Sequence, residues 1–180
     1  MRGLERRIAS GLSPDVRSVA SLFISRWDKA TMDKLPENLR DRLGIAIAES
    51  TYAAYRDLLD SEPWQRLANW GARTQRLLFA STGTKDPRAS DTLYIGALAA
   101  PNTINTIPED TLAHFADHGE VGGVLPRDGG RASETLSAIV KAGVDLDALA
   151  ADLQSEGAKT FDVSWSDLLK AIEMKSKALV

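Results

Sequence analysis

This sequence predicts an α/β fold built on a parallel sheet. Short apolar runs rich in β-branched and aromatic residues alternate with longer stretches of helical periodicity, in the order strand, helix, strand, helix, strand, helix. The 180 residues are 43% hydrophobic, and no internal repeat or low-complexity segment divides them. This length and composition suit one folded domain that buries most of its apolar surface.

Three runs are the expected strands, at residues 18–24, 76–81 and 102–106. The first two are compact and apolar, which is typical of buried strands. Three parallel strands are few for a chain of this length, and both edges of such a sheet would be bare. The sequence therefore resembles part of a larger parallel assembly.

The remaining periodic stretches are the expected helices. Gly11 should stop the first, Pro36 suits the first turn of the second, and Gly157 should end the sixth. Thr106 and Glu109 have the spacing of a capping box before the fourth. The expected helices cover residues 4–10, 36–59, 90–99, a stretch carrying Leu112 and Phe115, and residues 131–142, 145–156 and 164–179.

Composition excludes several classes of protein. The chain has no cysteine, which excludes a disulfide framework, a Cys-ligated metal site and a thiol nucleophile. No apolar run approaches the roughly 20 residues of a membrane span, and the charged N-terminus lacks the apolar stretch of a signal peptide. We therefore expect a cytoplasmic protein without a membrane partner.

Charge is unevenly distributed along the chain. Residues 1–90 contain 15 Lys and Arg against 11 Asp and Glu, whereas residues 91–180 contain 7 against 14. The acidic second half argues against nucleic-acid binding, which needs a broad basic face. The basic excess of the first half could serve a small anion or could be ordinary solvated surface.

Two tempting motifs do not have the features their chemistry needs. His114 and His118 would share one helix face, but a zinc protease motif needs Glu at the position of Phe115, and no third ligand is evident. The glycines at 119–123 do not follow a strand, so they do not form a dinucleotide fingerprint. We therefore expect no metal at the two histidines and a surface loop at the glycines.

The carboxyl ends of the predicted strands carry the informative side chains, because these ends line the ligand site of parallel α/β folds. Alternation sends Ser21 and Phe23 to the sheet face opposite the helices, and Arg26 follows on a loop. The second strand ends in Ser81, and Lys85 follows on the next loop. Hydroxyls and cations at two neighbouring strand ends suit a phosphate. Equally, the serines could fill a barrel interior and the cations could be solvated.

The chain resembles the C-terminal half of a transaldolase, of the bacterial type that also occurs fused to glucose-6-phosphate isomerase. The likeness runs through nearly the whole chain. The segments that carry it are residues 18–28, 71–87, 91–94, 100–109 and 115–120.

The resemblance implies a fold and a reaction. In this family the matching strands are six, seven and eight of a (β/α)8 TIM barrel, so residues 1–180 would be the C-terminal half of that domain. Residues 1–17 would lead into strand six, and residues 164–180 would form the closing helix. The family transfers a dihydroxyacetone unit between sugar phosphates of the pentose phosphate pathway, through a lysine Schiff base and without metal or organic cofactor. Its substrates are fructose 6-phosphate, sedoheptulose 7-phosphate, erythrose 4-phosphate and glyceraldehyde 3-phosphate.

The resemblance also assigns roles to residues. By position, Ser21 and Arg26 match the phosphate-binding pair on strand six, Phe23 matches an aromatic residue of the substrate pocket, and Ser81 matches a phosphate-contacting serine on strand seven. Lys85 is a further candidate for the phosphate, although some branches of the family place an arginine nearer that strand end.

The chain departs from the family in what it lacks. The Schiff-base lysine and the acid/base carboxylates of the family lie on earlier strands. None of the eight lysines here lies inside an apolar strand, where desolvation could lower the pKa of an amine. We therefore expect no catalytic residue in this chain. The alternative function is a non-catalytic half-barrel, or a segment of a bifunctional transaldolase/isomerase, that at most binds phosphate. In either case we expect self-association or pairing with a missing barrel half.

Overall fold

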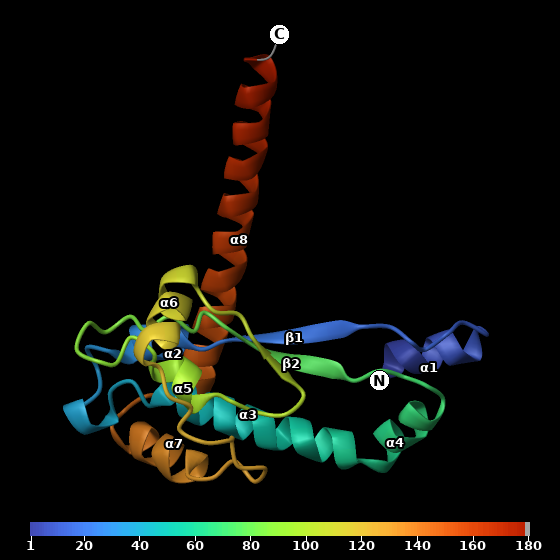
Figure 1. Ribbon diagram of the computed structural model, residues 1–180, viewed down its shortest axis with the longest axis horizontal. Coiled ribbons are helices and arrows are strands. Elements are labelled where there is room, and N and C mark those ends of the chain that lie inside the picture. Colours follow the sequence, from blue (N-terminus) through green and yellow to red (C-terminus); the bar gives the residue numbers. More distant parts are fainter. Residues whose placement is uncertain (179–180) are drawn as a thin grey trace. The chain divides into compact units, whose positions relative to one another are not determined.

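The computed structural model describes residues 1–178 (Figure 1). The chain divides into two compact units, Met1–Ala142 and Gly143–Val180. The first contains the sheet and the helices up to α7, and the second contains the single long helix α8 (Leu146–Lys177). No helix of the described residues is long and apolar enough to cross a membrane.

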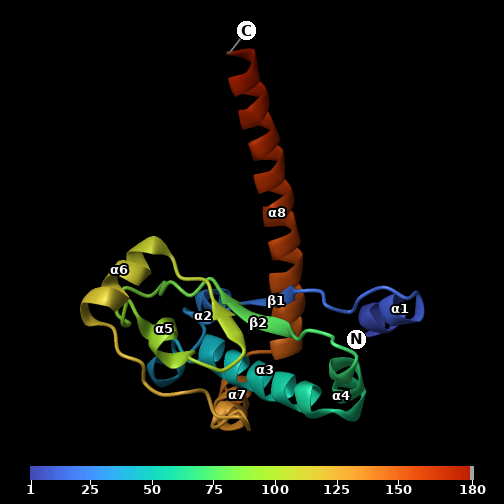
Figure 2. The same ribbon diagram turned by 45° about the vertical axis from the view of Figure 1, so that its right-hand side comes forward.

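The first unit is built on a three-stranded parallel sheet of order β1-β2-β3 (Figures 1 and 2). Its strands are β1 (Ser18–Phe23), β2 (Gln75–Ala80) and β3 (Thr103–Asn105). The predicted parallel sheet is therefore confirmed, although β3 is shorter than expected. Since Phe23 pairs with Ala80 and Phe79 pairs with Asn105, the carboxyl ends of the strands lie at one end of the sheet.

Helices occupy every connection between the strands. Three of them, and a 3-10 turn, separate β1 from β2. One short helix separates β2 from β3, and within the first unit two helices follow β3. In chain order the helical elements are α1 (Arg2–Ala9), α2 (Ser25–Thr31), η1 (Glu37–Leu39), α3 (Leu43–Asp60), α4 (Glu62–Asn69), α5 (Leu93–Ala97), α6 (Glu109–His118) and α7 (Ala132–Lys141).

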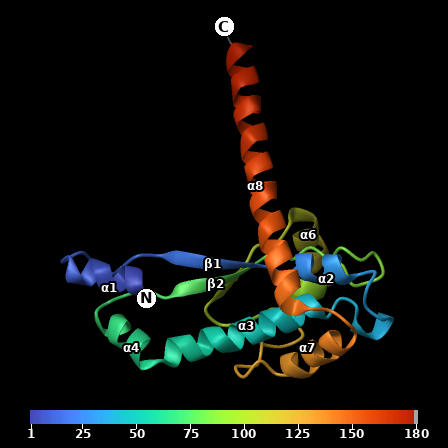
Figure 3. The ribbon, with the colours of Figure 1, turned by 180° about the vertical axis from the view of Figure 1, so that it is seen from behind.

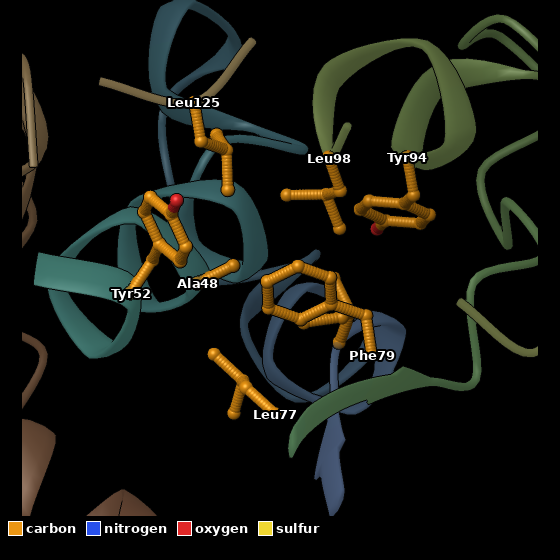
Figure 4. Close-up of a cluster of buried hydrophobic side chains, with 8 residues drawn as sticks. Ala48, Tyr52, Leu77, Phe79, Tyr94, Leu98 and Leu125 are labelled. Atoms are coloured by element: carbon orange, nitrogen blue, oxygen red, sulfur yellow. The ribbon is translucent and has the colours of Figure 1, made fainter. Parts of the chain in front are cut away.

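Helix α3 runs along one face of the sheet, as the view from behind also shows (Figure 3). Leu77 and Phe79 of β2 point from that face toward Ala48 and Tyr52 of α3 (Figure 4). The cluster also contains Ile24, Tyr94, Leu98 and Leu125. Removing each large apolar side chain from water contributes about 1.5–3 kcal/mol, so this cluster holds the sheet to its helices.

The two faces of β1 differ as the alternation predicts. Leu22 packs against the buried cluster, and Ile24 beyond the strand is fully buried. Ser21 is exposed and Phe23 is half-buried. Neighbouring side chains of a strand point to opposite faces, so Ser21 and Phe23 belong to the face that α3 does not cover.

The helix predicted for residues 36–59 is wrong at its start. Pro36 precedes only the 3-10 turn η1, and Arg40 is extended again with ψ 149°. Asp41 then has φ 56°, in the left-handed region, and α3 begins at Leu43. Helix α2 and a separate α4 are additions that the sequence pattern did not predict.

Two predicted helix boundaries also need correction. The capping box of Thr106 and Glu109 does not form, because the Thr106 hydroxyl donates to the carbonyl of Phe79 and α6 begins after Pro108 without a side-chain cap. Gly157 does not end a helix either, since α8 is continuous through it. A glycine costs a helix interior about 1 kcal/mol relative to alanine, which is not enough to stop it.

Candidate functional site

The backbones of β1 and β2 stay together past their last residues. The N–H of Ile24 donates to the carbonyl of Ala80 at 2.8 Å, and the N–H of Ser25 donates to the carbonyl of Ser81 at 3.1 Å. The first turn of α2 therefore begins beside the residue that follows β2.

Ser25 and Ser81 form a hydroxyl pair at this junction. Their Oγ atoms lie 2.8 Å apart, and either can donate. Ser81 has φ 56°, a left-handed conformation that is uncommon for residues other than glycine. Ser25 is almost fully buried. Sequence reasoning selected Ser81 but missed Ser25, because nothing in its residue type or spacing predicts a partner so far along the chain.

Arg26 lies in the first turn of α2, which corrects the predicted loop position. The chain passes from strand to helix with only Ile24 between them. The guanidinium carbon of Arg26 is 4.4 Å from the ring centroid of Phe23. This stacking brings two predicted site residues together and restricts the arginine side chain. Arg26 forms no ion pair within residues 1–178.

Ser21 lies on β1 two residues before Phe23, opposite Leu78 of β2. No hydrogen bond joins it to Arg26 or Ser81 in the described part of the chain. The structure therefore places Ser21 on the same sheet face as Phe23 and leaves its hydroxyl exposed.

Lys85 lies on the loop after β2, as predicted, and is exposed. Its Nζ is 3.7 Å from the position that a Cβ on Gly83 would take, so the ammonium folds back toward the strand end. The neighbouring carboxylate does not neutralise it. Asp86 accepts from Arg88 at 2.9 Å (Nε) and 2.5 Å (Nη2), and these bonds lower the pKa of Asp86 to about 2.

Behind the strand ends lies a buried carboxylate that sequence reasoning missed. Asp28 of α2 accepts hydrogen bonds from the N–H groups of Leu43 and Gly44 and from the Tyr94 hydroxyl. Burial raises the pKa of Asp28 and that of Tyr94. The Asp28 carboxylate thus joins α2, α3 and α5.

Two other features involve none of these side chains. His114 and His118 both contact the carboxylate of Asp91, at 3.1 and 3.0 Å, and their rings stack on α6. An apolar hollow of about 650 Å³ opens at the other end of the sheet, where Ser18 and Gln75 begin β1 and β2. The hollow therefore lies away from the hydroxyls and cations described above.

The residues at and just beyond the ends of β1 and β2 thus include hydrogen-bond donors: the Ser81 hydroxyl, the Arg26 guanidinium and the Lys85 ammonium. No lysine lies on any of the three strands. Such a set can bind and orient a phosphate, because charge-assisted hydrogen bonds from a planar guanidinium suit its oxygens.

Comparison with known proteins assigns the family. Residues 6–172 match the sequence profile described as Transaldolase/Fructose-6-phosphate aldolase. The chain belongs to this family. It is 40% identical to a transaldolase of Mycolicibacterium smegmatis over 96% of its own length and 49% of that protein.

Other relatives agree with this assignment. The chain is 42% identical to a transaldolase of Parafrankia sp., over 96% of the chain and 49% of the relative. It is 38% identical to one of Neisseria meningitidis, over 93% and 48%. The chain therefore spans about half the length of the curated relatives it matches, and its parallel α/β sheet fits the TIM barrel of the family.

Proposed function

We propose that this chain is the phosphate-binding half of a transaldolase of the pentose phosphate pathway, acting in the cytoplasm. In this proposal β1, β2 and β3 are strands six, seven and eight of the barrel. Ser21, Arg26, Ser81 and Lys85 hold the substrate phosphate, and Phe23 lines the pocket. The sugar phosphates are fructose 6-phosphate, sedoheptulose 7-phosphate, erythrose 4-phosphate and glyceraldehyde 3-phosphate.

The observation that carries the proposal is the junction of β1 and β2. There Ser81 meets the first turn of α2, and Arg26 stacks on Phe23 without a carboxylate partner in residues 1–178. Barrel enzymes bind the phosphate of their substrate at the carboxyl ends of the parallel strands. Arg26 supplies a cation that is held in place at this end of the sheet.

The chemical step belongs to residues outside this chain. A lysine amine attacks the ketone of the donor sugar, water leaves, and the resulting iminium accepts the electrons released when the carbon–carbon bond breaks. Carboxylates move the protons. The residues described here bind and orient the phosphate, so that the reacting carbon of the sugar lies at a fixed distance from that lysine.

The alternative is a half-barrel that binds phosphate without catalysis. The positions of the lysines favour this alternative. In the unit Met1–Ala142 every lysine lies on a helix or a loop and none lies inside a strand, where desolvation could activate an amine. The same alternative includes the case in which this chain is a segment of a bifunctional transaldolase/isomerase and at most binds phosphate. In both cases we propose that the isolated chain self-associates.

Kinetics of Arg26→Ala tests the proposed site. The assay uses a hybrid in which this chain replaces the matching half of the Mycolicibacterium smegmatis transaldolase. Loss of a charge-assisted hydrogen bond costs roughly 1.5–3 kcal/mol, so kcat/KM for fructose 6-phosphate should fall by about one to two orders of magnitude. Because phosphate binding orients the sugar, kcat should fall along with the rise in KM.

Arg66→Ala is the matched control, since within residues 1–178 the Arg66 side chain pairs only with Glu62, on the exposed surface of α4. It should change activity by less than about 0.5 kcal/mol, as is usual for such surface substitutions. Equal kinetics for the two variants would remove Arg26 from the site. Borohydride trapping of the 180-residue chain with fructose 6-phosphate tests what the two functions share. Neither places a Schiff-base lysine in this chain, so a covalent adduct on Lys85 would contradict both.

A further inference from the structure

The buried carboxylate of Asp28 belongs to the same short helix as Arg26 of the proposed phosphate site. Asp28 follows Arg26 by two residues on α2, and only 4% of its surface is exposed. Its Oδ1 accepts the Leu43 N–H at 2.9 Å, and both its oxygens lie within 3.2 Å of the Gly44 nitrogen. Its Oδ2 also accepts the Tyr94 hydroxyl at 2.8 Å.

Through these bonds Asp28 of α2 caps the N-terminus of α3. Arg42 precedes α3 and provides no side-chain cap. The first N–H groups of a helix have no partner within it, and the Asp28 carboxylate satisfies two of them. The partial positive charge of the helix N-terminus also stabilises the carboxylate.

The packing at this joint leaves little room for movement. A Cβ added to Gly44 would lie 2.6 Å from Asp28 Oδ2 and 2.8 Å from the Ile24 carbonyl oxygen. Tyr94 is fully buried in the cluster below the sheet. Asp28 therefore ties α2 to two elements that are themselves held by the core.

The first turn of α2 carries groups of the proposed site. Ser25 bonds to Ser81 through both its backbone and its hydroxyl, and Arg26 stacks on Phe23. Since α2 has only seven residues, a few contacts set its direction. Its first residue is held by Ser81, and its central residue, Asp28, is held by α3 and α5.

We infer that Asp28 is a positioning residue for the phosphate site, acting with Tyr94 to fix α2 and through it the guanidinium of Arg26. The inference rests on the proposed function, because it concerns the same anion site. Asp28 itself does not touch the substrate phosphate. A carboxylate beside that phosphate would repel it, whereas the Asp28 carboxylate is buried and accepts hydrogen bonds from three donors of the protein.

Binding of inorganic phosphate to the 180-residue chain tests the inference, measured by chemical-shift titration of the isotope-labelled protein. Tyr94→Phe removes one hydroxyl and leaves the cap of α3 intact. Asp28→Asn keeps the shape of the side chain but replaces one accepting oxygen by an NH₂ group, which faces the N–H and hydroxyl donors that Asp28 binds. We expect Tyr94→Phe to weaken phosphate binding about threefold and Asp28→Asn about tenfold, in proportion to one and to several lost hydrogen bonds.

A double-mutant cycle distinguishes positioning from general destabilisation. If Asp28 acts through Arg26, then Tyr94→Phe and Asp28→Asn should change phosphate binding less than twofold when Arg26→Ala is already present. In the single variants the Nε–H of Arg26 should also gain mobility on the picosecond-to-nanosecond timescale, seen by ¹⁵N relaxation. A merely structural role would weaken binding equally in both backgrounds and leave Arg26 as ordered as before.

The possible outcomes separate the two proposals. If Arg26→Ala weakens phosphate binding but the variants of Asp28 and Tyr94 do not, the positioning role is wrong and the site stands. Equal effects of Tyr94→Phe with and without Arg26→Ala overturn the positioning role as well. If the unmodified chain does not bind phosphate, or Arg26→Ala leaves binding unchanged, the proposed site fails and the inference fails with it.

Discussion

Gly44 lies against the buried carboxylate of Asp28, and its replacement by alanine should lower the free energy of unfolding. In an open helix Gly→Ala stabilises by up to about 1 kcal/mol. Here the new methyl group would overlap Asp28 Oδ2 and the Ile24 carbonyl, and the Ile24 backbone is held by Ala80. Gly44→Ala should therefore destabilise the chain by about 1–3 kcal/mol, the usual range for overpacking. Urea unfolding measures it.

Gly3→Ala is the matched control for this prediction. Gly3 also lies in a helix, α1, but no atom lies within 4 Å of its added Cβ. The free energy of unfolding should stay the same or rise slightly. If Gly44→Ala were as stable as Gly3→Ala, the close joint between α2 and α3 would be wrong.

The positions of single residues could be predicted from the sequence where an apolar run marks a strand. Ser81 directly follows β2, Lys85 lies on the loop beyond it, and the sheet face of Phe23 follows from alternation within β1. Asp28 and Tyr94 could not be predicted, because a helical aspartate normally lies on the surface and a helical tyrosine normally packs in a core. Their hydrogen bond joins chain segments whose proximity appears only once β1 and β2 are paired.

Elements were predictable in proportion to their length and periodicity. The strands β1 and β2 stand out as apolar runs, and their parallel pairing follows from the helices between them. Helix α2 has seven residues, too few for a periodic pattern, so Arg26 was expected on a loop. The continuous helix α8 was divided at Gly157, because a glycine is a common helix stop but does not end a helix by itself.

At the level of elements, α6 is held to the segment before α5 by a contact that depends on pH. His118 lies 3.0 Å from Asp91 and 3.1 Å from Asp117, and these carboxylates raise the pKa of His118. The same contact lowers the pKa of Asp91. The stabilisation from His118 is thus full below its unfolded pKa of 6.5 and is lost as the pH rises through the higher folded value.

The stability difference between the unmodified chain and His118→Gln should therefore be larger at pH 5.5 than at pH 8. Denaturant unfolding at the two pH values measures it. Asp91→Asn removes the main partner and should flatten the pH dependence as well. A difference that is the same at both pH values would show that the histidine does not act through its charge.

At the scale of the whole molecule, the sheet of the first unit ends in unpaired edges. Within the described residues β1 and β3 each pair only with β2. Ser18, Val19, Ala20 and Ser21 of β1 are exposed, and the apolar hollow beside it is lined by Leu4, Val16, Leu58 and Trp64 among others. An unpaired parallel edge next to an apolar hollow favours association with another chain.

Sedimentation velocity should therefore show association of the 180-residue chain that increases across the micromolar range. Val19→Lys places a charge on the exposed edge of β1, where it needs no repacking because Val19 is 44% exposed. This variant should shift the chain toward monomer without loss of secondary structure, since lysine on an edge strand opposes pairing. A heat-stable monomer at every concentration would contradict self-association, and it would mean that the exposed edge of β1 is tolerated without a partner.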